Sequence, residues 1–199
     1  MIQMEDRVRH LFAMNIENKM TVADTLSAMV AKAGARLVDC LLNNGKIFVC
    51  GNGASAANGL HFAASMLNHF EVERPPLPVI VLPTDLVTAT SIASDGHYDQ
   101  IFARHIQALG QETDVLVTLS TTGNSDNILQ AVHAAKDRGM DTIVLSGRDG
   151  GVLTNHLGPE DLEIRVPGEH ASSIRETHLA IIHCFCDLID QSLFGQMLG

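Results

Sequence analysis

The chain is poor in basic residues. Its 13 Lys and Arg residues stand against 23 Asp and Glu residues, which gives a formal net charge of −10. A surface that coats nucleic acid needs clustered Lys and Arg, so we expect no direct contact with nucleic acid. Any role in DNA metabolism would then run through a protein partner.

The chain also has few cysteines, and it lacks export and membrane signals. Cys40, Cys50, Cys184 and Cys186 include no Cys-x-x-Cys pair, so we expect core thiols in a reducing cytosol. Residues 1–6 carry charges and no apolar centre, which argues against a signal peptide. No uncharged apolar run reaches the ~18 residues of a membrane span. These absences predict a cytoplasmic protein with no membrane partner.

Apolar residues, by contrast, are plentiful. Hydrophobic side chains make up 46% of the 199 residues, which predicts one folded domain with a full core. Apolar runs typical of strands alternate with stretches of helical spacing. The expected strands are 47–50, 79–82, 114–119, 142–145 and 162–166, and the main expected helices are 5–18, 21–43, 54–70, 125–138 and 170–195. This alternation predicts a three-layer α-β-α sandwich around a five-stranded parallel sheet.

The two expected N-terminal helices lie outside that alternation. Residues 1–44 would carry them, and residues 45–199 would form the α/β core of the same domain. Both helices have much apolar surface. That surface can cover a partner subunit or pack within the monomer, and the sequence leaves both uses open.

Two short loops carry the chemistry. Cys50-Gly51-Asn52-Gly53-Ala54-Ser55 and Ser120-Thr121-Thr122-Gly123-Asn124-Ser125 each follow an expected strand and precede an expected helix. Backbone N–H groups, hydroxyls and a positive helix end at such a loop suit an anion. One such loop alone is equally typical of a turn with a helix N-cap. Two on one parallel sheet predict a pocket for a phosphorylated small molecule at the carboxyl ends of the strands.

Neither loop matches a common nucleotide-binding motif. No Gly-Lys-Ser/Thr follows, so they are not Walker P-loops, and the third glycine of Gly-x-Gly-x-x-Gly is missing. Together with His61-Phe62-Ala63 they instead resemble a sugar isomerase (SIS) domain. Arg74-Pro75 and the stretches 108–110, 147–151 and 163–167 extend the likeness over nearly the whole chain.

Within the SIS family, the chain is similar to the phosphoheptose isomerases and to their relative DiaA, a protein that binds the replication initiator DnaA. The resemblance implies a flavodoxin-like fold, a homotetramer and a phosphosugar site between subunits. The residues that we expect to hold the phosphosugar are Asn52, Gly53, Ser55, Asp95, Ser120, Thr121, Thr122 and Ser125.

The resemblance also implies a zinc site of His, Glu, Gln and His in the isomerases, whose Glu and second His transfer protons. His61 and His183 match the two histidines, but Ser65 stands at the Glu position and Arg175 at the Gln position. Serine supplies no carboxylate, and the permanent charge of arginine repels a cation. Glu176, one residue further, lies about 100° around the helix and is a poor replacement.

His61 and His183 alone would make an incomplete zinc site. They are either remnants that now pack in the structure or a functional metal pair. We expect no cofactor unless the chain is an isomerase, in which case zinc is implied and His183 would be the catalytic residue.

These departures predict a DiaA-like, non-catalytic scaffold that binds DnaA and promotes the initiation of chromosomal replication while keeping a phosphosugar pocket. Leu193 and Phe194 match a Leu-Phe pair that contacts DnaA in DiaA, although they can equally end the core face of the last helix. One alternative is a phosphoheptose isomerase that converts sedoheptulose 7-phosphate into D-glycero-D-manno-heptose 7-phosphate for lipopolysaccharide synthesis. Another is a regulator that senses a phosphosugar.

Overall fold

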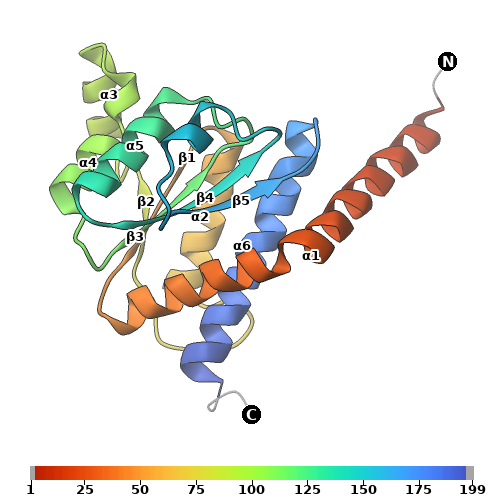
Figure 1. Ribbon diagram of the computed structural model, residues 1–199, viewed down its shortest axis with the longest axis horizontal. Coiled ribbons are helices and arrows are strands. Elements are labelled where there is room, and N and C mark those ends of the chain that lie inside the picture. The colour runs from red at the N-terminus through yellow and green to blue at the C-terminus, as the bar shows by residue number, and fades with distance from the viewer. Residues whose placement is uncertain (1–2, 196–199) are drawn as a thin grey trace.

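A five-stranded parallel sheet lies between two layers of helices (Figure 1). The structure is a computed structural model and describes residues 3–195. The strands are β1 (Ile47–Gly51), β2 (Val79–Leu82), β3 (Val115–Leu119), β4 (Asp141–Gly147) and β5 (Leu162–Val166), in the spatial order β2-β1-β3-β4-β5. Short apolar strands buried on both faces favour this parallel arrangement. The predicted α/β sandwich is confirmed.

Helices cover each face of the sheet. One face packs against α1 (Met4–Leu42), α2 (Ala54–Leu67) and α6 (Ala171–Phe194), whose buried side chains join alternate residues of the strands in one core. The second core lies under α3 (Leu86–Ser94), α4 (Ala103–Leu109) and α5 (Asp126–Asp137). Two short 3-10 helices, η1 (Tyr98–Gln100) and η2 (Val152–His156), complete that layer.

The strand order reverses between β1 and β3. Ile47 on β1 pairs with Val79 of β2 on one side and with Val115 of β3 on the other, so the chain leaves the sheet in opposite directions from this point. Ligands of doubly wound sheets bind beyond the carboxyl ends of the strands at such a reversal. Both glycine-rich loops begin here, because one follows β1 and the other follows β3.

The two N-terminal helices expected from the sequence are one continuous helix. Lys19 and Met20 lie between the expected helices, and both residue types favour helix, so nothing there ends α1. The carboxyl half of α1 buries Val22, Val30 and Leu37 against the core. The amino half extends away from the body (Figure 1) and exposes Met4, Val8, Leu11, Phe12, Ile16 and Met20. Packing within the monomer therefore accounts for only half of this helix.

The cysteines follow the same pattern of burial. Cys40, Cys50 and Cys186 are buried, Cys184 is exposed, and all are free thiols. Among the described residues, no helix combines the length and the apolar character needed to cross a membrane.

Candidate active site

The first loop opens α2 without a side-chain cap. Gly53 is the N-cap residue and adopts a φ of +54°, a left-handed conformation that glycine reaches without strain. Having no side chain, it provides no side-chain cap for the first N–H groups of α2, although the Ser55 N–H donates to the Asn52 carbonyl. No side-chain oxygen therefore competes with an anion at this helix end.

The second loop opens α5 in a similar way. Ser125 is the N-cap residue, yet its hydroxyl does not bond to the helix that it precedes. The Ser120 hydroxyl is turned inward and accepts a hydrogen bond from the Gly123 N–H at 3.0 Å. Thr121, Thr122 and Ser125 remain half-buried. The Ser125 hydroxyl thus does not cap α5, whereas the Ser120 hydroxyl holds the loop at Gly123.

The turn after β4, at residues 148–153, packs against the second loop and forms hydrogen bonds with it. The Gly123 carbonyl accepts a hydrogen bond from Leu153 N–H at 3.0 Å, and the Asn124 side-chain oxygen accepts one from Val152 N–H at 2.9 Å. Gly123 has a φ of +65°, and a β-carbon there would collide with the Gly150 carbonyl. The loop and the turn can therefore approach this closely only because residue 123 is glycine.

Asn52 and Asn127 join the two loops. Each side-chain amide donates to the side-chain oxygen of the other, and both N···O distances are 2.8 Å. Asn52 was predicted to contact the phosphosugar, and the structure shows that part of its amide is already engaged. Asn127 was not predicted. Its buried place in the first turn of α5 gives no local sequence signal.

Two other predicted ligands lie in different surroundings. Ser55 is buried in the first turn of α2, next to the first loop. Asp95 is the exposed residue that ends α3, and its backbone N–H donates to the Ser91 carbonyl at 3.2 Å. Within residues 3–195, none of the hydrogen bonds of Asp95 joins it to either loop.

The two predicted histidines meet across the helix pair. The Nε2 atoms of His61 on α2 and His183 on α6 are 2.9 Å apart, and the rings meet edge to face with centroids 5.1 Å apart. Phe70 lies beside His183, with ring centroids 5.6 Å apart. One imidazole must donate and the other accept at this distance, so the pair shares one N–H.

The electrostatic surroundings favour a neutral His183. Burial lowers the pKa of His183, the neighbouring His61 lowers it further, and Glu71 opposes both effects. Sequence reasoning considered only Glu176 as a carboxylate near this pair. Glu71 follows α2 in a connecting segment, so its position depends on how that segment folds back towards α6.

A zinc ion is what the family resemblance implies at this pair, and the residues present do not fit a complete site. Ser65 is buried on α2 and supplies no carboxylate. Arg175 is positively charged and bonds through its carbonyl to the Asn58 side chain at 2.9 Å. Across the described residues, no three His, Cys, Asp or Glu side chains gather as metal ligands.

A second buried histidine connects α6 to the sheet. His178 Nε2 lies 2.8 Å from the Ser146 carbonyl on β4, and its Nδ1 is buried without a hydrogen-bond partner. A carbonyl only accepts, so Nε2 must carry the proton. Burial lowers the pKa of His178 to about 4, the Ser146 bond opposes this, and Arg175 adds to it. His178 is therefore neutral at physiological pH.

A buried ion pair holds the other ends of α2 and α6 together. Arg74 Nε donates to Asp190 Oδ1 at 2.7 Å, and the same guanidinium donates to the Ser65 and Met66 carbonyls at 2.9 and 2.7 Å. These carbonyls belong to the last turn of α2, which has no further helical partners for them. The Arg74 side chain thus caps the carboxyl end of α2 and forms an ion pair with Asp190 on α6.

Leu193 and Phe194, predicted as a partner-binding pair, are both half-buried at the end of α6. Leu193 packs against the core, and the Phe194 ring centroid lies 6.0 Å from the Arg74 guanidinium. The pair therefore helps to cover the buried ion pair.

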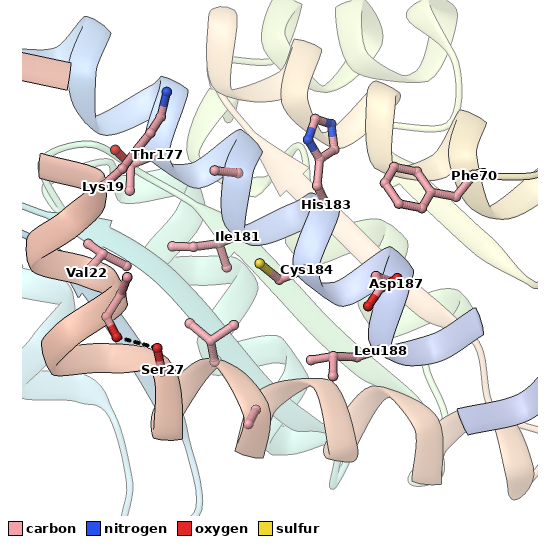
Figure 2. Close-up of a pocket in the computed structure, with 14 residues that line it drawn as sticks. Lys19, Val22, Ser27, Phe70, Thr177, Ile181, His183, Cys184, Asp187 and Leu188 are labelled. Atoms are coloured by element: carbon pink, nitrogen blue, oxygen red, sulfur yellow. Dashed lines mark hydrogen bonds between the residues drawn. The ribbon is translucent and has the colours of Figure 1, made fainter. Parts of the chain in front are cut away.

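A groove of about 610 Å³ runs between α1 and α6, with His183 at one border (Figure 2). Its lining is mostly apolar, and Lys19, Asp187 and Cys184 are among the few polar residues. Figure 2 shows Phe70 beside His183 and Leu188 facing α1. The two glycine-rich loops do not line this groove, so it is a separate feature that borders the histidine pair.

Comparison with known proteins identifies relatives along the whole chain. The model of the SIS domain family matches residues 12–147. The phosphoheptose isomerase of Halorhodospira halophila is 50% identical over 190 residues, which cover 96% of each chain. That of Shewanella sp. strain ANA-3 is 47% identical over 193 residues, covering 97% of this chain and 98% of the relative.

Solved structures agree with these relatives. A phosphoheptose isomerase from Francisella tularensis matches with a TM-score of 0.92 and 43% identity, over 96% of this chain and all of the other. The enzyme from Neisseria gonorrhoeae matches with a TM-score of 0.89 and 39% identity, over 95% of this chain and all of the other.

These relatives correct the functional expectation drawn from the sequence. The prediction of a DiaA-like, non-catalytic scaffold for DnaA is wrong, because relatives with about half of their residues in common are phosphoheptose isomerases. That prediction relied on Ser65 and Arg175, two positions in a chain that otherwise matches those enzymes from end to end. The comparison favours the isomerase alternative.

Proposed function

Since this chain belongs to the SIS domain family, we propose that it is a phosphosugar isomerase of the phosphoheptose type. Its substrate would be sedoheptulose 7-phosphate, and its product D-glycero-D-manno-heptose 7-phosphate. The observation that carries the proposal is the His61–His183 pair, with Nε2 atoms 2.9 Å apart, on two helices that start at the ligand-binding edge of the sheet. The relatives at 47–50% identity support the same reaction.

The spacing along α2 suits a seven-carbon substrate. His61 lies seven residues after Ala54, the first residue of the helix, which corresponds to about 10 Å along its axis. An extended heptose 7-phosphate spans roughly 10 Å from C1 to phosphorus, since six C–C bonds, one C–O bond and one O–P bond of about 1.5 Å each advance about 1.3 Å along the chain. A phosphate at the open end of α2 would therefore bring C1 and C2 close to the imidazoles.

The reaction moves one proton between neighbouring carbons. A base removes a proton from C1 of the ketose while the C2 oxygen gains one, which gives an enediol. Loss of the O1 proton and protonation of C2 then give the aldose, so no oxidant or second substrate is needed. We assign the C1 proton to His183, because a lowered pKa leaves its imidazole neutral and basic near pH 7. His61 is the group that exchanges a proton with it.

We derive no step through zinc, because Ser65 and Arg175 do not provide the ligands that the resemblance implies. The proposed reaction therefore depends on this chain's own side chains. The phosphate would be held by the N–H groups that open α2 and α5 and by the Thr121, Thr122 and Ser125 hydroxyls. A phosphate held in this way fixes the distance between C1 and the imidazoles.

The test is proton NMR of the purified protein with sedoheptulose 7-phosphate in D₂O. Turnover would produce the anomeric signals of the aldose and replace the C1 protons of the ketose with deuterium. A parallel reaction with a chelator should proceed at the same rate. If neither signal changes while the Francisella tularensis relative is active in the same buffer, the proposed reaction is wrong.

We also propose that the protein works as a homotetramer, as the family resemblance implies. The exposed apolar face of the amino half of α1 and the groove beside it support an interface between copies. Phe12→Glu places a charge on that face and should yield smaller species in light scattering after size-exclusion chromatography. Arg7→Glu, which makes a charge change at an exposed position of the same helix outside the groove, is the matched control. A wild-type monomer would contradict the proposal.

A further inference from the structure

The Asn52–Asn127 pair is the feature of the site that the reaction does not use. Asn52 lies between two glycines in the first loop, and Asn127 is 3% exposed in the first turn of α5. Their amides form two reciprocal hydrogen bonds, each 2.8 Å long. The two residues are 75 positions apart in the sequence and meet only because β1 and β3 are neighbours.

The first loop has little else to hold it. Its backbone bonds are local, from Ser55 N–H to the Asn52 carbonyl and from Ala57 N–H to the Gly53 carbonyl. Gly53 has no side chain, and the space where its β-carbon would lie is empty. Within the described chain, the amide pair is the side-chain hydrogen bond that joins this loop to the second one.

Reciprocal pairing also sets the direction of both amides. Each amide has one oxygen and one NH₂ group, and turning either one over would place like groups face to face. The second N–H of Asn52 and the free lone pair of its oxygen therefore point in fixed directions. These are the groups that a sugar hydroxyl or a phosphate oxygen at the first loop would meet.

We propose that Asn127 is a positioning residue for phosphosugar binding: it fixes the side chain of Asn52 and the spacing of the two loops without touching the ligand itself. The ligand class rests on the proposed function. Loss of the pair lets the first loop move relative to the second, so a phosphate that needs N–H groups from both loops is bound more weakly.

Asp at position 127 offers a reversible test of this role. A carboxylate cannot donate to the Asn52 oxygen, whereas a protonated carboxyl group donates and accepts just as the amide does. Asn127→Asp should therefore break the pair at high pH and restore it at low pH. Asn124→Asp is the matched control, since it adds the same charge to the second loop and keeps the oxygen that accepts from Val152 N–H.

The binding experiment is calorimetric titration with sedoheptulose 7-phosphate near pH 8 and near pH 5.5. Asn127→Asp should bind roughly tenfold more weakly than Asn124→Asp at the higher pH, as for the loss of two buried hydrogen bonds. The gap should narrow at the lower pH, because burial at this 3% exposed position raises the pKa of the new carboxyl group and favours its protonated form. Ionisation of the phosphate affects both variants alike. Equal losses in both variants at each pH would contradict the proposal.

A second measurement needs no ligand. Hydrogen–deuterium exchange of residues 51–57 should speed up in Asn127→Ala, although the substitution lies on another element, and it should not speed up further in the Asn52→Ala/Asn127→Ala double variant. Unchanged exchange in this segment would overturn the positioning role. If Asn127→Ala fails to fold, Asn52→Ala breaks the same pair from the more exposed side. Its exchange rate is then compared with that of the wild-type protein.

The two measurements separate this proposal from the proposed reaction. A wild-type protein that binds the phosphosugar without converting it would refute the isomerase function and leave the binding comparison valid. A wild-type protein that does not bind it leaves the exchange comparison to decide the role of Asn127.

Discussion

The site has two ends that are built in different ways. At the sheet, the proposed phosphate-binding end consists of two loops that offer backbone N–H groups and nearby hydroxyls, each in a run of six residues. Along α2 and α6, the proposed proton-transfer end consists of single side chains, and His61 and His183 are 122 positions apart. The first end depends on local backbone geometry, and the second on how two helices pack.

This difference decides what a substitution does at each end. Thr122 and Ser125 both offer hydroxyls. A Thr→Ser or Ser→Thr substitution at either position would therefore keep a hydroxyl that can bind an anion. Ser65 and Arg175, in contrast, stand where the resemblance implies a Glu and a Gln, while the fold matches that of the Francisella tularensis relative at a TM-score of 0.92. Chemistry at the helix end can therefore change with no change of fold.

The largest effect should come from the helix end. His183→Ala removes the proposed base, and kcat should fall by about 10²–10⁴, the usual contribution of general acid–base catalysis. Binding of the phosphosugar should change little, because the phosphate lies at the loops. Both quantities come from NMR turnover and calorimetry. His133→Ala is the matched control, since His133 forms a similar pair with His156, at 3.1 Å, on another face. If His133→Ala lowered kcat as much as His183→Ala, the proposed role of His183 in proton transfer would be wrong.

The ion pair that joins α2 and α6 tests whether the helix end depends on packing. Arg74→Ala leaves Asp190 buried and unpaired, which should lower the free energy of unfolding by about 3–5 kcal/mol. Urea unfolding at neutral pH measures it. Arg9→Ala breaks the exposed Arg9–Glu5 pair, at 2.6 Å, and should have no measurable effect. A small loss for Arg74→Ala would mean that the helices are held mainly by apolar contacts.

His178 allows the contact between α6 and the sheet to be followed by pH. Its pKa is about 4 in the folded protein and 6.5 in a model compound, so the unfolded chain binds a proton first as the pH falls. Stability should therefore be lost between about pH 6.5 and pH 4, by roughly 3 kcal/mol in all. His178→Asn keeps a donor for the Ser146 carbonyl and should flatten this decline in urea unfolding. His10→Asn, on the exposed part of α1, should leave it unchanged.

The smallest effect should come from a single hydroxyl at the loop end. Ser125→Ala should weaken phosphosugar binding by about tenfold, the value of one charge-assisted hydrogen bond, with no loss of stability, because this hydroxyl does not cap α5. Ser120→Ala should weaken phosphosugar binding and also lower the stability of the fold, since the Ser120 hydroxyl accepts a hydrogen bond from the Gly123 N–H. Calorimetry and thermal unfolding distinguish the two serines. Identical behaviour would show that the loop does not divide these roles.

The same division explains what the sequence could predict. The strands were predicted to within two residues at each end, because continuous apolar runs followed by glycine and hydroxyl residues are local signals. The partners of Asn52, Arg74 and His178 were not predictable, since each lies on an element distant in the chain. The single helix α1 was predicted as two, because its apolar residues form one series over 5–18 and another over 21–43, and the spacing does not show that the helix continues through Lys19 and Met20.

The close contact between the glycines of the second loop and those of the turn after β4 couples residues 120–125 to residues 147–154. A side chain at Gly123 would strike the Gly150 carbonyl, and one at Gly151 would strike the Thr122 carbonyl, so neither segment can gain bulk alone. Transplanting residues 120–125 into another sheet would therefore succeed only together with residues 147–154. The second loop and the turn after β4 therefore form one structural unit, and recombination or design must move both segments together.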